Sequence, residues 1–214
     1  MKIGILGSGE VGQALGDGFA SRGHDVKLGA REAANEKTAK WAAKHGGKGC
    51  AGTFRDAAAF GEVLVVATLW SGTEDALRLA GVENFKGKVV LDVTNPLVFE
   101  PNRPPRLALG TTDSGGEQVQ RWLPGARVVK VFNTVGNAHM VDPKFPGGPP
   151  DMFLCGNDEA ARRTVGDVCR AFGWNVVDLG GLEGSRLLEP MCVLWVTYGA
   201  LSGTWNHAFK LLRK

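Results

Sequence analysis

The stretch that decides the fold is GILGSGEVG, residues 4–12. Three of its glycines have the spacing GxGxxG, and an apolar run, residues 3–6, precedes them. In this spacing the first glycine permits a tight turn, the second lets the backbone approach a pyrophosphate, and the third lets a helix pack on a strand. The N–H groups at the start of that helix then hold the phosphates. The alternative is a glycine-rich turn that binds nothing. The predicted phosphate-binding residues are Gly7, Ser8, Gly9, Glu10, Val11 and Gly12.

Short apolar runs and amphipathic segments alternate along the chain after this loop. The runs are typical of buried parallel strands, and the segments between them have helical spacing. This βαβα order predicts an α/β fold, a Rossmann-type doubly wound parallel sheet whose ligands lie beyond the carboxyl ends of the strands. The expected strands are residues 3–6, 26–28, 63–67, 89–93 and 128–132, and the expected helices are residues 11–21, 35–44, 73–79 and 117–123.

The second half of the chain is predicted to extend this sheet. Residues 96–116 are rich in proline and glycine, which indicates an irregular crossing loop or lid. DMFLCGND and WNVVDLGG are two further strand candidates on either side of a helix over about residues 159–172, and the tail 187–214 fits a pair of helices. We therefore expect an NADP-binding domain at residues 1–135 and a small C-terminal lobe at residues 136–214. This lobe would extend the sheet, end in helices and cover a second-ligand site.

Composition excludes several classes of protein. The 214 residues are 43% hydrophobic and 22% charged, which is typical of a packed globular chain. The start, MKIGILGSGE, resembles no signal or transit peptide, so we expect a cytoplasmic protein without a membrane partner. The net charge of +3 includes no run of Lys and Arg, so nucleic acid is not an expected partner. The four cysteines are scattered singly, which predicts free thiols and no metal site.

The stretch GAREAANEK, residues 29–37, discriminates between NAD and NADP. An acid at the end of the second strand would bind both ribose hydroxyls, whereas an arginine attracts a 2′-phosphate and can stack on the adenine. Arg31 follows Ala30 at this position and favours NADP, with Asn35, Lys37 and Ser8 as further donors. The alternative is that Arg31 is a solvated arginine on an exposed loop.

Three later strand ends supply further candidates for the cofactor site. Trp70 could be a flat wall for a ring or a packed aromatic, and Asn95 could bind the cofactor or belong to a plain turn. Polar groups after the strand at residues 128–132 could reach the carboxamide of a nicotinamide. The candidates at these three ends are Thr68, Leu69 and Trp70, then Asn95 and Pro96, then Asn133, Thr134 and Val135.

No catalytic group can be assigned from the sequence. His139 is the candidate for a general acid or base at this edge, but a histidine bonded to backbone at a helix start is the more common case. No Ser/His/Asp, paired-carboxylate or Lys/His constellation has a plausible spacing. The chain is therefore predicted to place two ring systems together rather than to move protons.

Several stretches together resemble the family of coenzyme F420-dependent NADP oxidoreductases, which is related to the oxidoreductase domain of the STEAP metalloreductases. They are ILGSGEVGQALG, GAREAANEK, VTNP, SGGEQVQRWLPGARVVKVFNTVGNAHM, FLCGND and GSRLLEPMCVLW. The resemblance implies hydride exchange between NADPH and a deazaflavin, with the two rings stacked in one cleft, usually in a homodimer. It also implies that Ser185 and Arg186 lie near the second ring system, although Arg186 could instead pair with Glu189. His139 is kept as a third candidate for contact with the second ligand.

The chain departs from the family pattern at two places. Members that use the deazaflavin typically have a GGTGxxG-type loop and an asparagine in SNSR, whereas this chain has GSGEVG and Gly184. The second ligand could therefore be coenzyme F420, a flavin, a quinone-like compound or a small carbonyl substrate. Direct hydride transfer requires alignment more than an acid or base, which suits a site without a triad.

Three functions remain open from the sequence. The first is an NADPH-dependent reductase of a deazaflavin or flavin. The second is a non-catalytic NADP-binding module that senses redox state or binds a partner. The third, a dehydrogenase related to β-hydroxyacid or pyrroline carboxylate enzymes, is least favoured because the C-terminal part is short.

Overall fold

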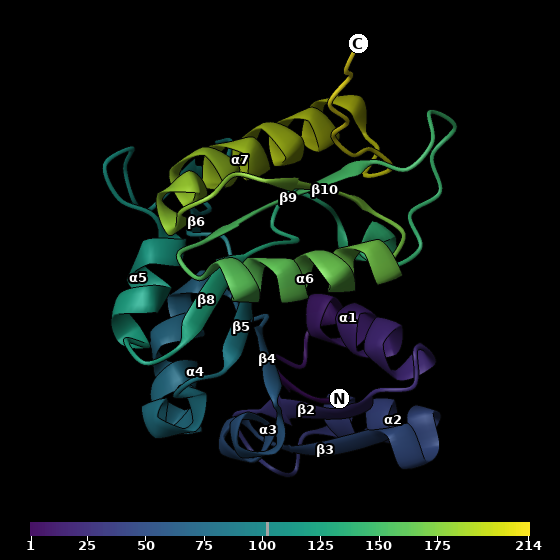
Figure 1. The fold of residues 1–214 in the computed structure, drawn as a ribbon, viewed down its shortest axis with the longest axis vertical. Coiled ribbons are helices and arrows are strands. Elements are labelled where there is room, and N and C mark those ends of the chain that lie inside the picture. The colour runs from purple at the N-terminus through teal and green to yellow at the C-terminus, as the bar shows by residue number, and fades with distance from the viewer. Residues whose placement is uncertain (102) are drawn as a thin grey trace.

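The computed structural model describes residues 1–101 and 103–214 as one α/β unit with an eight-stranded sheet (Figure 1). The strands are β1 (Lys2–Leu6), β2 (Asp25–Ala30), β3 (Gly49–Thr53), β4 (Val63–Val66), β5 (Val89–Asp92), β8 (Arg127–Lys130), β9 (Asp151–Gly156) and β10 (Asn175–Asp178). The helices are α1 (Glu10–Ser21), α2 (Glu36–His45), α3 (Phe54–Phe60), α4 (Thr73–Ala80), α5 (Gly115–Trp122), α6 (Glu159–Ala171) and α7 (Ser185–Ser202). The predicted Rossmann-type fold is confirmed.

The order of the strands is β10-β9-β8-β5-β4-β1-β2-β3. Strands β1 to β5 and β8 run parallel, so their carboxyl ends meet at one edge of the sheet. The register at this edge aligns Leu6 with Val66, Val66 with Asp92, and Asp92 with Lys130. The loops that follow these residues therefore surround one crevice.

Helices cover both faces of the sheet and enclose two buried clusters. Leu15 of α1, Trp41 of α2 and Val165 of α6 belong to the cluster on one face. The cluster on the other face includes side chains of α3, α4 and α5, and also Leu188 of α7. Both faces of the central strands are thus buried, which explains the short apolar runs at residues 3–6 without Gly4, 63–66 and 89–91 in place of an alternating pattern.

The C-terminal strands differ from the predicted parallel arrangement. Strand β9 pairs antiparallel with β8, and β10 then pairs parallel with β9. A parallel neighbour of β8 would require a crossover helix. Residues 131–150 contain several prolines and form only a short 3₁₀ turn, Asn137–His139, so the chain returns in the opposite direction.

Two other segments differ from the sequence prediction. In place of a pair of C-terminal helices there is one helix, α7, which lies beside β9 at the top of Figure 1 and is followed by an extended tail. Within the irregular loop 96–116, the two-residue strands β6 (Leu97–Val98) and β7 (Arg106–Leu107) form a small antiparallel pair. A left-handed Gly203 ends α7, and no helical segment follows among the described residues.

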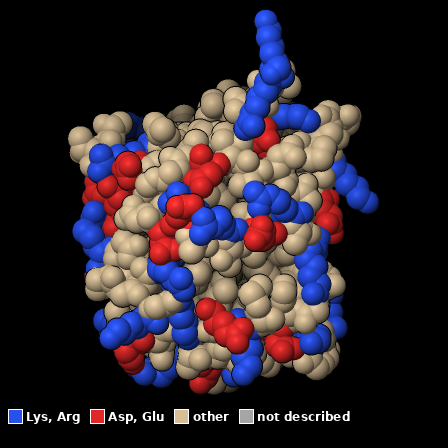
Figure 2. All heavy atoms as spheres, viewed as in Figure 1, with Lys and Arg blue, Asp and Glu red and all other residues tan. Residues whose placement is uncertain are grey.

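The surface in Figure 2 has basic and acidic side chains interspersed over the face that α6 occupies. Ion pairs on this helix join Arg163 to Glu159 and Arg170 to Asp167. In the described ranges, no helix is both long and apolar enough to cross a membrane.

Candidate functional site

A cavity of about 770 Å³ lies at the carboxyl edge of the sheet, beside the ends of β1, β2, β4 and β5. This is the crevice in which doubly wound sheets bind their ligands. Its described lining consists of Gly7, Ser8, Gly9, Glu10, Val11, Arg31, Lys37, Phe54, Ala67, Thr68, Leu69, Trp70, Ser71, Gly72, Val93, Thr94, Asn95, Leu97 and Phe99. The structure thus brings the predicted glycine loop, the Arg31 region and the ends of β4 and β5 together, while their roles in binding stay predictions.

The glycine loop is packed so tightly that two of its positions require glycine. Gly7 has φ +140°, and a Cβ on it would lie 2.3 Å from the carbonyl oxygen of Ala67. A Cβ on Gly12 would lie 2.0 Å from the carbonyl oxygen of Gly7. Gly9 is different, because a Cβ there would meet no described atom within 4 Å. The first and third glycines therefore shape the loop, and the second one borders open space in the cavity.

The start of α1 is available for an anion. Gly9 is its N-cap residue and provides no side-chain cap, and Gly9, Glu10 and Val11 all line the cavity. The first N–H groups of a helix have no partner within the helix and carry the positive end of its dipole. The loop therefore has the arrangement that binds a pyrophosphate.

At the end of β2, the structure places two cations beside the cavity. Arg31 and Lys37 are exposed, and neither takes part in an ion pair among residues 1–101 and 103–214. Asn35 instead caps α2, because its side chain accepts a hydrogen bond from the Thr38 N–H at 3.1 Å. Ala30 is buried and ends β2. Two cations and a helix start are thus assembled where a 2′-phosphate would lie.

The opposite end of the cavity is largely apolar. Leu69 and Phe99 are 82% and 69% exposed, although both line the cavity. Trp70 packs against Trp122, with 5.4 Å between the ring centroids. Thr68 forms a hydrogen bond through its hydroxyl with that of Thr73 at 2.9 Å. A flat ring could contact this end of the cavity without any charged partner.

Asn95 and Asn133 form a pair of amides at this end. Asn95 donates a hydrogen bond to the Asn133 carbonyl oxygen at 2.9 Å, and the Asn133 Nδ2 donates to Asn95 Oδ1 at 3.1 Å and to the Leu188 carbonyl at 2.9 Å. The Oδ1 of Asn133 is buried and has no hydrogen-bond partner among the described residues. Asn133 is 3% exposed and lies outside the described lining of the cavity, so contact between this acceptor and a ligand stays a prediction.

Three other residues that were predicted near the cofactor lie behind the residues that line the cavity. Thr134 and Val135 are buried beside Asn133, outside the described lining of the cavity. Pro96 is buried as well and lies against the start of α5 at Gly115. Thr134, Val135 and Pro96 therefore pack behind the lining residues of the cavity, and a direct contact with a ligand stays a prediction.

The candidates for the second ligand do not line the cavity as described. Ser185 is buried, and its hydroxyl lies 3.4 Å from the Cys155 thiol. Burial raises the pKa of this thiol to about 11, so Cys155 remains protonated at neutral pH. The Nε2 of His139 lies 3.0 Å from the Oδ1 of Asn206, and the His139 ring packs against Phe145. Ser185, Arg186 and His139 are thus outside the described lining of this cavity, and their contact with a second ligand stays a prediction.

Arg186 has a different partner from the one considered in the sequence. Its guanidinium donates two hydrogen bonds to Glu117 of α5, including Nε to Oε2 at 2.8 Å, whereas Glu189 lies inside the protein. The Arg186–Glu189 pair, which was the alternative to a role at the second ligand, is thus wrong. Hydrogen bonds from Arg186 hold the pKa of Glu117 below its ordinary value.

The Arg186–Glu117 pair predicts a pH-dependent loss of stability. Because the pKa of Glu117 is depressed in the folded state, the pair stabilises above the ordinary glutamate pKa and loses this contribution as the pH falls through the depressed value. We expect Arg186→Met to lower the Tm at pH 7 by on the order of 2 °C. The difference from the parent protein should shrink at about pH 3, measured by thermal unfolding. Unchanged Tm with impaired acceptor turnover would instead assign Arg186 to the second ligand.

Several lining residues were missed in the sequence. They are Phe54, Ala67, Ser71, Gly72, Val93, Thr94, Leu97 and Phe99. Ala67 and Val93 are the last residues of predicted strands and Thr94 follows one of them, so including each strand end with the next residue would have found all three. Leu97 and Phe99 lie in the proline-rich loop, where no hydrophobic periodicity indicates which side chains face the cavity.

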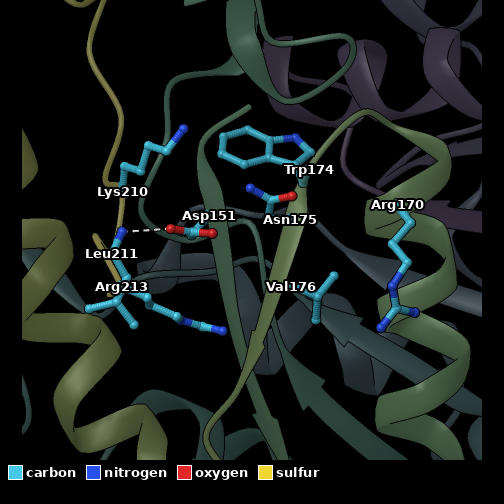
Figure 3. A pocket seen from close by; sticks show the side chains of 8 residues that line it. All are labelled: Asp151, Arg170, Trp174, Asn175, Val176, Lys210, Leu211 and Arg213. Atoms are coloured by element: carbon cyan, nitrogen blue, oxygen red, sulfur yellow. Dashed lines mark hydrogen bonds between the residues drawn. The ribbon is translucent and has the colours of Figure 1, made fainter. Parts of the chain in front are cut away.

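A second hollow, of about 380 Å³, contains no predicted site residue (Figure 3). Asp151 at the start of β9 accepts a hydrogen bond from the Leu211 N–H at 2.6 Å and donates its own N–H to Phe209 at 3.0 Å. The nearby Lys210 donates to the Gly147 carbonyl. These contacts fix the C-terminal tail against β9, so the hollow is explained by the attachment of the tail.

The glycine loop and the cavity beyond a mostly parallel sheet define a dinucleotide-binding protein of the Rossmann class. Residues 2–96 match the family described as NADP oxidoreductase, coenzyme F420-dependent. The crystal structure of a putative F420-dependent NADP reductase from Arthrobacter sp. FB24 is 37% identical, with a TM-score of 0.92 over 100% of both chains. The chain belongs to the family of coenzyme F420-dependent NADP oxidoreductases.

Two curated relatives agree with this membership. The F420-dependent NADP reductase of Methanocaldococcus jannaschii is 32% identical over 144 residues, which are 66% of this chain and 64% of the relative. Metalloreductase STEAP3 of Rattus norvegicus is 28% identical over 199 residues, which are 89% of this chain and 36% of the relative. The chain thus spans less than two thirds of each of these relatives. The family is one of NADP-dependent oxidoreductases, which implies NADP(H) as the nucleotide.

Proposed function

We propose that this protein transfers a hydride between NADPH and a planar redox acceptor of the deazaflavin or flavin class. The observation that carries the proposal is the separation of charge along the cavity. The ionisable residues of its described lining are Glu10, Arg31 and Lys37, all at the nucleotide end. The other end is formed by uncharged side chains, including Trp70 and Phe99. Such a site can align two rings but supplies no side chain to donate or accept a proton.

The residues at the nucleotide end fit NADP(H). The uncapped start of α1 would hold the pyrophosphate, and Arg31 with Lys37 would hold the 2′-phosphate. At the other end of the cavity, Asn133 Oδ1 is a buried acceptor just outside the described lining, and a carboxamide N–H is a donor of the kind it lacks. When bound, NADPH supplies the hydride, and the chain's own residues fix the orientation and exclude water.

The apolar end supports the choice of acceptor class. Leu69 and Phe99 expose most of their surface beside Trp70, and burying such surface against an aromatic ring is favourable. The relatives from Arthrobacter and Methanocaldococcus are described as F420-dependent NADP reductases, the former as a putative one. We therefore place coenzyme F420 first among the acceptors and FMN and FAD next.

The test is anaerobic turnover with each acceptor. The purified protein is mixed with NADPH and oxidised F420, FMN or FAD, and the loss of nicotinamide absorbance is followed. With F420, deuterium at C4 of NADPH should appear at C5 of the reduced deazaflavin, because a hydrogen bound to that carbon does not exchange with water. The single proton that completes the reduced acceptor comes from solvent. Tight NADPH binding without turnover of any acceptor would contradict the proposal and favour the non-catalytic NADP-binding module.

We also propose that two copies of the chain pair through α7. Leu187, Leu194, Tyr198 and Leu201 recur at helical spacing on this helix and are 65%, 58%, 53% and 84% exposed. The sequence from 190 to 209 contains no Asp, Glu, Lys or Arg. An apolar stripe of this kind on one face suits a self-complementary contact about a two-fold axis.

Leu201→Glu is expected to convert this dimer into a monomer. The new carboxylate would be buried without a partner in the contact, which is strongly unfavourable. Light scattering coupled to size-exclusion chromatography measures the mass. Leu212→Glu is the matched control, because Leu212 is equally exposed at 85% but lies in the tail. If the parent protein were already a monomer, or if both variants lost the dimer equally, α7 would not be the contact.

A further inference from the structure

Lys130, the last residue of β8, is a buried charged residue that has no role in the proposed reaction. Its side chain is completely buried, and its ammonium group lies 2.7 Å from Asp92 Oδ2, 3.0 Å from Glu189 Oε1 and 2.8 Å from the Thr94 carbonyl oxygen. The Thr94 carbonyl oxygen accepts a hydrogen bond from this ammonium group, and the two carboxylates form buried ion pairs with it. Burial alone would lower the pKa of Lys130, but the two carboxylates outweigh this effect and raise the pKa, so the lysine is charged.

Asp92 connects this lysine to the wall of the cavity. Asp92 and Lys130 are register partners on the adjacent strands β5 and β8. The other oxygen of Asp92 accepts hydrogen bonds from the Thr94 N–H at 3.0 Å and the Thr94 hydroxyl at 2.7 Å. Thr94 and Asn95 line the cavity. The position of this turn therefore depends on two contacts with Asp92 and one with Lys130.

Glu189 connects the same lysine to α5 and α7. Its carboxylate accepts hydrogen bonds from the N–H groups of Gly115 at 2.9 Å and Gly116 at 3.0 Å, which are the first residues of α5. The preceding residue of α7, Leu188, accepts the hydrogen bond from Asn133. Two consecutive residues of α7 thus hold Lys130 and Asn133.

We propose that Lys130 is a positioning residue for the nicotinamide end of the cofactor site, an inference that rests on the proposed function. It fixes the turn that carries Asn95 and the helix that holds Asn133, the two amides that pair at that end of the cavity. Without the ammonium group, Asp92 and Glu189 would be two buried carboxylates with no cation between them, and the turn and the helix would separate. Among residues 1–101 and 103–214, no hydrogen bond or ion pair joins this cluster to α1 or β2, which form the adenine end.

The experiment compares two ligands on the same variant. NADPH contains the nicotinamide, whereas adenosine 2′,5′-bisphosphate contains only the adenine end, and both are titrated by calorimetry. For Lys130→Met we expect the Kd for NADPH to rise about fivefold, or about 1 kcal/mol, while the Kd for the bisphosphate changes by less than about twofold. The fluorescence of bound NADPH, which reports the surroundings of the dihydronicotinamide, should shift toward that of the free cofactor.

Two further variants separate positioning from folding. Val165→Ala removes buried volume from α6, away from the cavity, and should lower Tm without changing either Kd. Glu189→Gln leaves the Asp92–Lys130 pair in place and decides the question if Lys130→Met does not fold; a selective rise in the Kd for NADPH is again expected. An equal loss of affinity for NADPH and for the bisphosphate would overturn the positioning role. So would the absence of a selective loss of NADPH affinity in both variants. No NADPH binding by the parent protein would instead contradict the proposed function.

Discussion

Arg31→Asp is expected to raise the Kd for NADPH by tenfold to a hundredfold and to leave the Kd for NADH unchanged or lower. Arg31 is exposed beside the cavity at the end of β2, with no ion partner in the described part of the chain. A hydrogen bond to a charged group contributes roughly 1.5–3 kcal/mol, and the new aspartate would in addition repel the 2′-phosphate. The same aspartate can accept hydrogen bonds from the ribose hydroxyls of NADH. Calorimetric titration with both cofactors measures the effect.

Lys40→Asp is the matched control for this change in charge. Lys40 is also an exposed cation near the start of α2, but it pairs with Glu36 and does not belong to the described lining of the cavity. A general change in electrostatic potential would affect both variants similarly and would fall with added salt. A direct contact with the 2′-phosphate requires a loss that is specific to Arg31 and to NADPH. An equal response of NADPH and NADH would show that Arg31 does not select the cofactor.

Gly12→Ala and Gly9→Ala are both expected to weaken NADPH binding, but only Gly12→Ala is expected to lower the Tm. In Gly12→Ala the new Cβ would lie 2.0 Å from the Gly7 carbonyl oxygen, so α1 must shift away from the loop. We expect a lower Tm together with a loss of NADPH affinity on the order of a hundredfold, because the phosphate site is distorted. In Gly9→Ala the new Cβ meets no described atom, and φ −74° is accessible to alanine. Its Tm should therefore be unchanged.

The NADPH affinity of Gly9→Ala should nevertheless fall by about tenfold or more, since its methyl group would occupy the space where the pyrophosphate approaches the backbone. Thermal unfolding without ligand and calorimetry with NADPH measure the two quantities separately. If Gly9→Ala bound NADPH as well as the parent protein, the pyrophosphate would not approach the loop at this residue. An unchanged Tm for Gly12→Ala would show that α1 can shift without loss of thermal stability.

The sequence predicted the centre of the fold better than its edges. The strands next to the glycine loop contain buried apolar runs, such as Val63–Val66 in β4, and these runs are decisive because both faces are buried. Strand β3, with the sequence GCAGT, was missed because glycine, alanine and threonine give it little apolar character. The reversal of β9 was also missed, because strand direction depends on the connection and not on the composition of the strand itself.

The site was predictable where it follows directly from strand ends. Arg31 and Asn95 were found because the carboxyl ends of parallel strands meet at one edge. The role of Lys130 was not found, because its partners Asp92 and Glu189 lie far from it in the sequence and a buried ion cluster produces no local periodicity. Arg186 was misassigned for the same reason, since its partner Glu117 comes from a helix on the other side of β8 and β9 in the sequence.

The three charges at the centre of the molecule also impose an order on synthesis. Asp92 and Lys130 leave the ribosome before Glu189, which lies in the last helix of the chain. Until α7 has been made, the start of α5 lacks its carboxylate and the third donor of Lys130 lacks its acceptor. The strands around the glycine loop can pair early in translation, since domains form as their segments emerge. The turn at Thr94 and Asn95 therefore reaches its final structure only after α7 has been made and Glu189 has met Lys130.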